Sequence, residues 1–155
     1  MARKFLVVAD DSPEFAAALR FAARRARSTG GRVVMLRMLP DNTDAHWSGA
    51  REEIERQQRE EAEALLNRLG EEAAERSGAA PVFLIEKGDA QGAIKKAVAD
   101  DPEIKILVLA AGSGSRGPGP LVSAIIKHGA QLGSRKLPVT IVPGDLTEAE
   151  LEDLA

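Results

Sequence analysis

The stretch KILVLAAGSGSRGPGP, residues 105–120, carries the pattern that decides the fold. An apolar run from Ile106 to Ala111 leads into a loop with four glycines, and Pro120 then opens a new apolar segment. This order predicts a buried strand, a glycine-rich loop and a helix. Glycine lets the backbone approach a phosphate closely, and free N–H groups at a helix start favour negative charge. The segment therefore predicts an anion-binding loop, and the alternative is a plain connection of small residues.

Working outward, other short apolar runs have the length and composition of strands buried on both faces of a sheet. With the strand at residues 104–110, the predicted strands are Phe5–Ala9, Arg32–Leu39, Pro81–Glu86 and Leu137–Val142. Helical patterns separate them, at about residues 13–28, 50–77, 90–100 and 120–128. Strands that alternate with helices predict an α/β fold, with a parallel sheet covered by helices on both faces.

The helix ends are predicted from capping residues. After the first strand, Ser12 is expected as the N-cap, with Pro13 at the first helical position and Glu14 favouring the positive helix start. Residues 50–77 should form a long polar helix with an apolar stripe that begins at Ile54. Residues 1–145 are predicted to form one domain. The acidic segment 146–155, which opens with a capping box, is expected to be a helical tail.

Composition excludes several classes of function. The chain has 155 residues, a net charge of −3, interspersed charges of both signs and no cysteine. It therefore offers no thiolate metal site or cysteine nucleophile, and no basic bias towards nucleic acid or an anionic membrane. No apolar run approaches the roughly 20 residues needed to span a bilayer. We expect a cytoplasmic protein.

The candidate site lies where the first and fourth predicted strands end. Ligands of open α/β sheets bind outside the carboxyl ends of the strands. If these two strands are neighbours, Asp10 and the loop from Gly112 to Gly119 share one crevice. The Asp10 carboxylate would contact a ribose or a metal ion, or only support the helix start. Met38, near the end of the second strand, would touch an adenine or pack in the core.

Dedicated catalysis is not predicted. The two histidines, His46 and His128, stand in different loops, with no serine or carboxylate at a spacing that indicates a triad. The serines near the predicted crevice also lack a visible base in the sequence. We therefore name no catalytic residue.

Taken together, the pattern resembles the universal stress protein family over nearly the whole chain. The matching pieces are FLVVADDSP (5–13), GGRVVML (30–36), EKGDA (86–90), LVLAAG (107–112) and LPVTIVP (137–143). The resemblance implies a Rossmann-like fold of the adenine-nucleotide alpha hydrolase type, an open five-stranded parallel sheet in the order 3-2-1-4-5. It also implies a stress-response or signalling module that forms a homodimer through the last strand, Leu137–Val142.

Many members of this family bind ATP through Gly-x-x-Gly, nine further residues, and then Gly-Ser or Gly-Thr. Here Gly114-Ser-Arg-Gly117 is similar to the first half, but Lys127 and His128 stand where the second half belongs. Two outcomes stay open, a member that does not bind nucleotides and an enlarged loop that holds phosphates differently. For the second, ATP or AMP, with Mg²⁺ at Asp10, is the expected cofactor. The expected contacts are Asp10, Met38, Gly112, Gly114, Arg116, Gly117 and Lys127.

Two other folds of similar pattern are weaker matches. A response-regulator receiver also opens with an acidic pair, but it needs an aspartate at the end of its third strand, where this chain has Glu86. A flavodoxin-like flavin carrier generally stacks aromatic side chains on the flavin, and aromatic residues make up only 3% of this chain. Both remain alternatives at the level of sequence.

Overall fold

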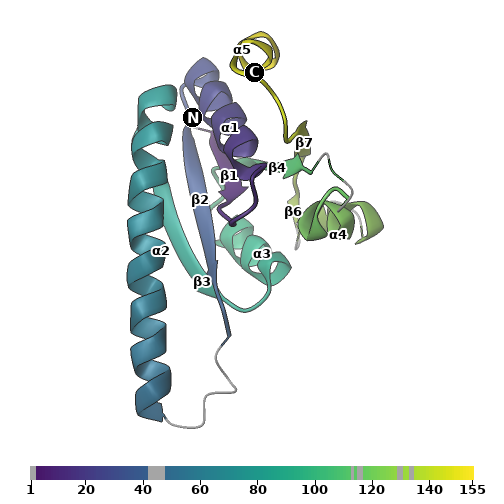
Figure 1. Ribbon diagram of the computed structural model, residues 1–155. Helices are drawn as coiled ribbons and strands as arrows, with labels where there is room; N and C mark the ends of the chain where they lie inside the picture. Colours follow the sequence, from purple (N-terminus) through teal and green to yellow (C-terminus); the bar gives the residue numbers. More distant parts are fainter. Residues whose placement is uncertain (1–2, 42–47, 113, 115–116, 129–130, 133–134) are drawn as a thin grey trace.

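The computed structural model describes residues 3–41, 48–112, 114, 117–128, 131–132 and 135–155. Its helices and strands follow the alternating order that the sequence predicts (Figure 1). The strands are β1 (Lys4–Val8), β2 (Arg32–Leu39), β3 (Val82–Lys87), β4 (Ile104–Ala111), β5 (Gln131–Leu132), β6 (Arg135–Lys136) and β7 (Val139–Pro143). The helices are α1 (Phe15–Thr29), α2 (Ser48–Ser77), α3 (Ala90–Asp100), α4 (Pro120–His128) and α5 (Glu148–Leu154).

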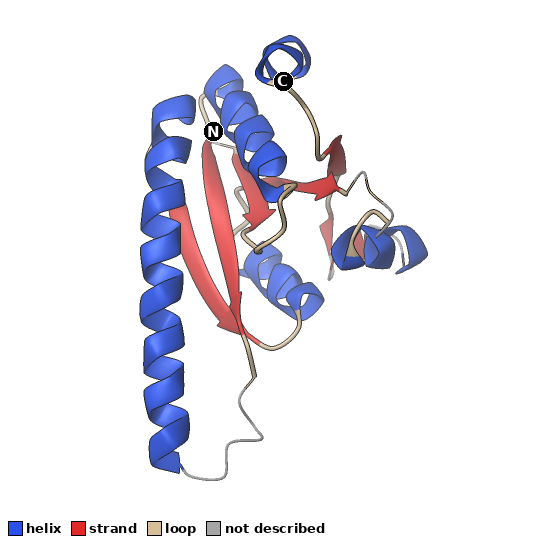
Figure 2. Cartoon of the chain, viewed as in Figure 1, coloured by secondary structure: helices blue, strands red, loops and turns tan. Residues whose placement is uncertain are grey.

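Five strands form one sheet in the order β3-β2-β1-β4-β7, and every pairing is parallel. Along the chain, β7 is the fifth strand of this sheet, so the predicted order 3-2-1-4-5 is confirmed. Figure 2 shows the sheet between helices on its two faces. The predicted α/β fold class is therefore also confirmed.

Alternate residues of the strands build two separate hydrophobic cores. In β1, Phe5 and Val7 face the core that α1 and α2 cover, whereas Leu6 and Val8 face the core that α3 and α4 cover. Because side chains alternate across a strand, a continuous apolar run serves both faces at once. This explains why the strands read as uninterrupted hydrophobic segments.

The start of α1 differs from the prediction. The helix begins at Phe15 with Glu14 as its N-cap, and Glu14 makes no side-chain capping bond. Ser12 instead donates from its backbone N–H and its hydroxyl to Oδ1 of Asp10, at 3.0 and 2.5 Å. A local bond between an Asx side chain and the backbone two residues later competes with helix capping, and here the helix starts two residues later than predicted.

The N-terminal part of helix α2 extends beyond the carboxyl ends of β2 and β3 (Figure 1). Its apolar stripe is buried where it faces the sheet, as at Leu66 and Ala73. The predicted stripe is wrong at its beginning, because Ile54 lies beyond the sheet and is 40% exposed. An ion pair of 2.9 Å between Lys87 and Glu55 joins this part of the helix to the end of β3.

Two features complete the fold near the C-terminus. The short antiparallel pair β5–β6 is absent from the prediction, because two-residue strands leave no periodic pattern. Its Arg135 donates to the carbonyl oxygens of Ile104, Val98 and Asp101 and so anchors the pair to the end of α3 and the start of β4. The capping box predicted at the start of α5 is confirmed, since Thr147 and Glu150 exchange both bonds.

Candidate functional site

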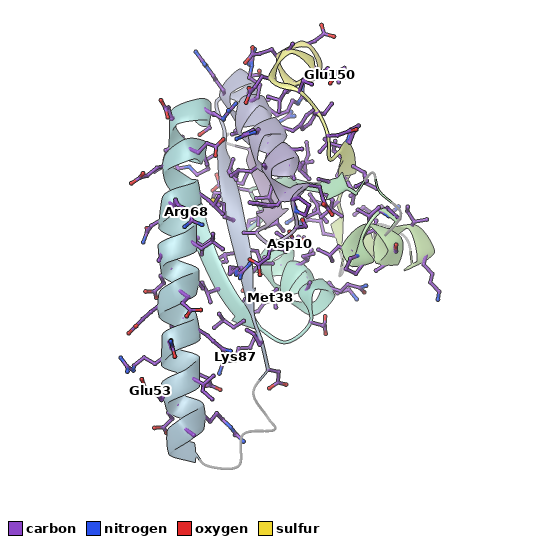
Figure 3. All side chains as sticks on the ribbon, in the orientation of Figure 1. Asp10, Met38, Glu53, Arg68, Lys87 and Glu150 are labelled. Atoms are coloured by element: carbon purple, nitrogen blue, oxygen red, sulfur yellow. The ribbon has the colours of Figure 1, made fainter. Side chains whose placement is uncertain are left out.

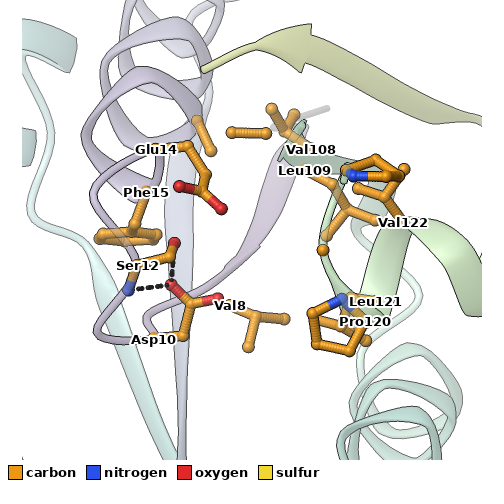
Figure 4. A pocket seen from close by; sticks show the side chains of 14 residues that line it. Val8, Asp10, Ser12, Glu14, Phe15, Val108, Leu109, Pro120, Leu121 and Val122 are labelled. Atoms are coloured by element: carbon orange, nitrogen blue, oxygen red, sulfur yellow. Dashed lines mark hydrogen bonds between the residues drawn. The ribbon is translucent and has the colours of Figure 1, made fainter. Parts of the chain in front are cut away.

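Strands β1 and β4 are neighbours, so their carboxyl ends bring Asp10 and the glycine-rich loop to one crevice. A cavity of about 70 Å³ lies there, between the start of α1 and the start of α4 (Figure 4). Its lining includes Asp10, Ser12 and Glu14 on one side, and Gly119 and Pro120 on the other. The predicted meeting of Asp10 with this loop is confirmed.

A wider depression adjoins the cavity and shares Asp10 and Pro120 with it. This depression, of about 340 Å³, also takes in Arg37, Met38 and Pro40 from the end of β2. Sites for small molecules commonly measure roughly 300–1,000 Å³, so the depression has room for a nucleoside whereas the cavity alone accepts only a small group. Figure 3 shows the side chains of Asp10 and Met38 close to the middle of the molecule, where β1 and β2 end.

The geometry of Asp10 and its neighbours is fixed by a small polar network. Asp10 holds the turn to Ser12, as described above. Beside it, Arg37 donates to the carbonyl oxygen of Ala9 at 2.9 Å and pairs with Asp11 at 3.1 Å. Arg37 therefore ties the end of β2 to the turn after β1, and one Asp10 oxygen stays clear of the Ser12 bonds and faces the crevice (Figure 4).

The glycine-rich loop is shaped by its own hydrogen bonds. Gly112 donates its N–H to the carbonyl oxygen of Pro118 at 3.1 Å, and Gly117 donates to that of Gly114 at 3.2 Å. Gly117 and Gly119 have φ values of 79° and 104°, which side-chain-bearing residues rarely adopt. Pro120 has no N–H, and the amides of Gly112 and Gly117 are used within the loop, so these three residues offer no free backbone donor to an anion.

Glu14 is the residue of this crevice that sequence reasoning missed. A Cβ placed on Gly112 would lie 3.3 Å from its Oε1, and one placed on Gly119 would lie 4.0 Å from the same atom. Its carboxylate therefore lies against the loop predicted to bind phosphate. The sequence gives no signal for this contact, because Glu14 and the loop are about 100 residues apart and either could pack elsewhere.

The other predicted contacts are placed as follows. Gly112, Gly114 and Gly117 belong to the loop, and Arg116 lies outside the described residues. Lys127 is exposed in the last turn of α4, about 10 Å along the helix axis from Pro120 at 1.5 Å per residue. Of the histidines, His46 also lies outside the described residues, and only the backbone of His128 is described.

The described residues contain no cluster of three or more His, Cys, Asp or Glu side chains that could hold a metal ion. In the same part of the chain, no helix is long and apolar enough to cross a membrane.

Comparison with known proteins adds an independent line of evidence. Residues 1–128 match the sequence model of the Universal stress protein family. Among curated protein sequences, none matches this chain significantly.

Solved structures give the same result for the fold. The universal stress protein UspA from Lactobacillus plantarum is similar with a TM-score of 0.70 and 19% identity, over 90% of this chain and 97% of that one. A universal stress protein in complex with cAMP has a TM-score of 0.63 and 14% identity, over 93% and 98%. One from Archaeoglobus fulgidus in complex with dAMP has a TM-score of 0.60 and 20% identity, over 90% and 97%.

Proposed function

The chain belongs to the universal stress protein family, and on that premise we propose that it binds an adenine nucleotide at the carboxyl ends of β1, β2 and β4. The observation that carries this proposal is the depression of about 340 Å³ that joins Asp10 and Met38 to the start of α4. Two structurally similar relatives hold adenine nucleotides, cAMP in one and dAMP in the other. Membership of this family also argues against a response-regulator receiver and a flavodoxin-like flavin carrier.

In this proposal the nucleoside occupies the depression. Met38 offers a polarizable thioether to the face of the adenine, and Pro40 adds an apolar wall. The free oxygen of Asp10 accepts a hydrogen bond from a ribose hydroxyl, because an ionised carboxylate is an acceptor of fixed position here. The ligand is thus recognised chiefly through its nucleoside half.

The phosphate end of the nucleotide points towards the loop of Gly112, Gly114 and Gly117. We propose that Arg116 and Lys127 are the cations that bind the phosphates. Lys127 lies in the last turn of α4, so it contacts a phosphate only if the ligand extends that far or the side chain moves towards it. Mg²⁺, if it accompanies the nucleotide, would be bound by the Asp10 carboxylate, since hard cations prefer carboxylate and phosphate oxygens.

A second candidate function is that of a family member without a nucleotide. The internal hydrogen bonds of Gly112 and Gly117 favour it, because a loop that satisfies its own amides is a poor anion site. Such a protein would act only through protein contacts. The two candidates make opposite predictions for ligand binding.

Titration calorimetry with adenosine, AMP and ATP decides between them. We expect saturable binding of at least one of the three, and a loss of at least about tenfold in affinity when Met38→Asp places a carboxylate against the base. Ile54→Asp, on the exposed end of α2, is the matched control and should bind as the natural chain does. Absence of binding at millimolar concentrations of all three ligands would establish the member without a nucleotide.

We also propose that the chain acts as a homodimeric stress-response module through the edge of β7. Strand β7 pairs only with β4 in the described sheet, so one edge of its backbone is open there. Its Ile141 is 40% exposed. An open strand edge with an apolar side chain is a common site for pairing with a second chain.

A further inference from the structure

We propose that Glu14 is a specificity-determining residue that keeps the β- and γ-phosphates out of the glycine-rich loop, so that the site prefers an adenine nucleoside with few or no phosphates over ATP. This inference rests on the proposed function, because it concerns the phosphate end of the same site. It goes further in naming which ligands of that class the crevice excludes, and which side chain excludes them.

The first observation is where the Glu14 carboxylate lies. Its Oε1 is near both Gly112 and Gly119, the two glycines where the loop leaves β4 and where it meets α4. Figure 4 shows the carboxylate pointing into the cavity, opposite the start of α4. A phosphate that approached the loop through the cavity would therefore meet this carboxylate first.

The second observation is the charge of the lining. Among the described residues that line the cavity, Asp10 and Glu14 are carboxylates and none is a lysine or arginine. Like charges a few ångströms apart repel strongly in a partly buried site, and each further phosphate adds negative charge to the ligand. The cavity thus disfavours ATP more than AMP, and AMP more than adenosine.

The third observation is that Glu14 has little freedom to withdraw. Gly144 packs directly on its Cβ, and a side chain at that position would overlap it. Its backbone is also fixed, since Ala17 donates its N–H to the Glu14 carbonyl oxygen at 3.1 Å. The side chain therefore starts from a fixed point between the loop and the end of β7.

The fourth observation concerns the loop itself. The amides of Gly112 and Gly117 bond to Pro118 and Gly114, so a phosphate would have to break these bonds to be held by them. Repulsion from Glu14 and the cost of breaking these two bonds act in the same direction. The nucleoside depression, by contrast, is reached from the Met38 side without passing Glu14, which does not line it.

The test compares Glu14→Gln with the natural chain, by titration calorimetry with adenosine and with ATP in EDTA, so that no Mg²⁺ bridges the carboxylates. We expect the natural chain to bind adenosine more tightly than ATP. Glu14→Gln keeps the shape of the side chain and removes its charge, and it should tighten ATP binding about tenfold while adenosine binding stays unchanged. Glu71→Gln, an exposed carboxylate of α2, is the matched control and should change neither affinity.

Three results would overturn the proposal. In the first, the natural chain binds ATP as tightly as adenosine. In the second, Glu14→Gln has the same ratio of adenosine affinity to ATP affinity as the natural chain. This result counts when the variant unfolds at the same temperature as the natural chain and still binds adenosine. In the third, neither adenosine nor ATP binds to either protein and the titration with AMP under Proposed function is negative as well, which refutes the proposed function and the role of Glu14 with it. The first two results leave the proposed function standing.

Discussion

Gly144 lies directly against Glu14, so the turn after β7 packs on the residue that precedes α1. A Cβ at Gly144 would overlap that of Glu14 and lie 2.6 Å from the carbonyl oxygen of Ala111. The same carbonyl accepts the N–H of Gly144 at 2.9 Å. The end of β7 therefore packs against both the glutamate and the end of β4, with no space for a side chain.

We predict that Gly144→Val lowers the free energy of unfolding by about 1–3 kcal/mol, because overpacking forces the neighbouring backbone to shift. Urea denaturation at pH 7 measures it. Gly114→Ala is the control, since a Cβ there would have no atom of the described residues within 4 Å, and it should unfold at nearly the same urea concentration. Equal midpoints for Gly144→Val and the natural chain would contradict the packing described here.

Asp10 provides a second prediction, for ligand binding. Asp10→Asn keeps an oxygen that accepts the Ser12 bonds and removes the negative charge that a ribose hydroxyl would meet. We expect adenosine to bind about tenfold more weakly, as for the loss of a hydrogen bond to a charged group, with little change in stability. Glu71→Gln, an exposed carboxylate of α2 that does not line the depression, is the control. Unchanged adenosine affinity in Asp10→Asn would place the ribose elsewhere.

The sequence predicted the parts of this molecule that repeat a simple period. Continuous apolar runs such as Phe5–Ala9 indicated strands buried on both faces, and Thr147 with Glu150 indicated a capping box. The meeting of Asp10 with the glycine-rich loop also followed from the sequence, because parallel neighbours share one edge of the sheet.

The rest depended on contacts between segments far apart in the chain. Ser12 reads as a helix cap, but its bond to Asp10 competes with capping, and no periodicity decides between them. Glu14 reads as a charge that favours a helix start, and its contacts with Gly112 and Gly144 join segments that are far apart in the chain. The glycines of residues 112–119 indicate that another group approaches the loop backbone closely. They do not show whether that group is a bound phosphate or another part of the loop, as in the hydrogen bonds of Gly112 and Gly117.

The N-terminal strand supports a prediction on pH. Lys4 pairs with Asp101 at 2.7 Å and with Glu103 at 3.2 Å. Burial by itself would raise the pKa of Asp101, but the bonds from Lys4 and from the Glu103 N–H, with the charges of Lys4 and Arg135, bring its pKa below the usual value. Since the folded pKa is the lower one, this carboxylate stabilises the fold above about pH 4, and the contribution is lost as the pH falls further.

We therefore expect Asp101→Asn to lower the free energy of unfolding by about 1 kcal/mol at pH 7, a value typical of a partly exposed pair. Near pH 2 the variant and the natural chain should differ little, because the carboxyl is then protonated in both states. Urea denaturation at the two pH values measures this, with Asp100→Asn, a neighbouring exposed carboxylate, as control. A difference that persists undiminished at pH 2 would assign the effect to packing rather than to charge.

The open edge of β7 leads to the last prediction, on assembly. If two chains pair through this edge, the exposed side chain of Ile141 lies in or beside the interface, and Ile141→Lys would place like charges from both chains close together. We expect the natural chain to have the mass of a dimer in light scattering coupled to size-exclusion chromatography, and Ile141→Lys to have that of a monomer. Ile126→Lys introduces the same charge on α4, where the side chain is 69% exposed, and should leave the dimer intact. A monomeric natural chain would exclude pairing through β7. Pairing through β7 would also be excluded if the natural chain is a dimer, Ile126→Lys is a monomer and Ile141→Lys remains a dimer.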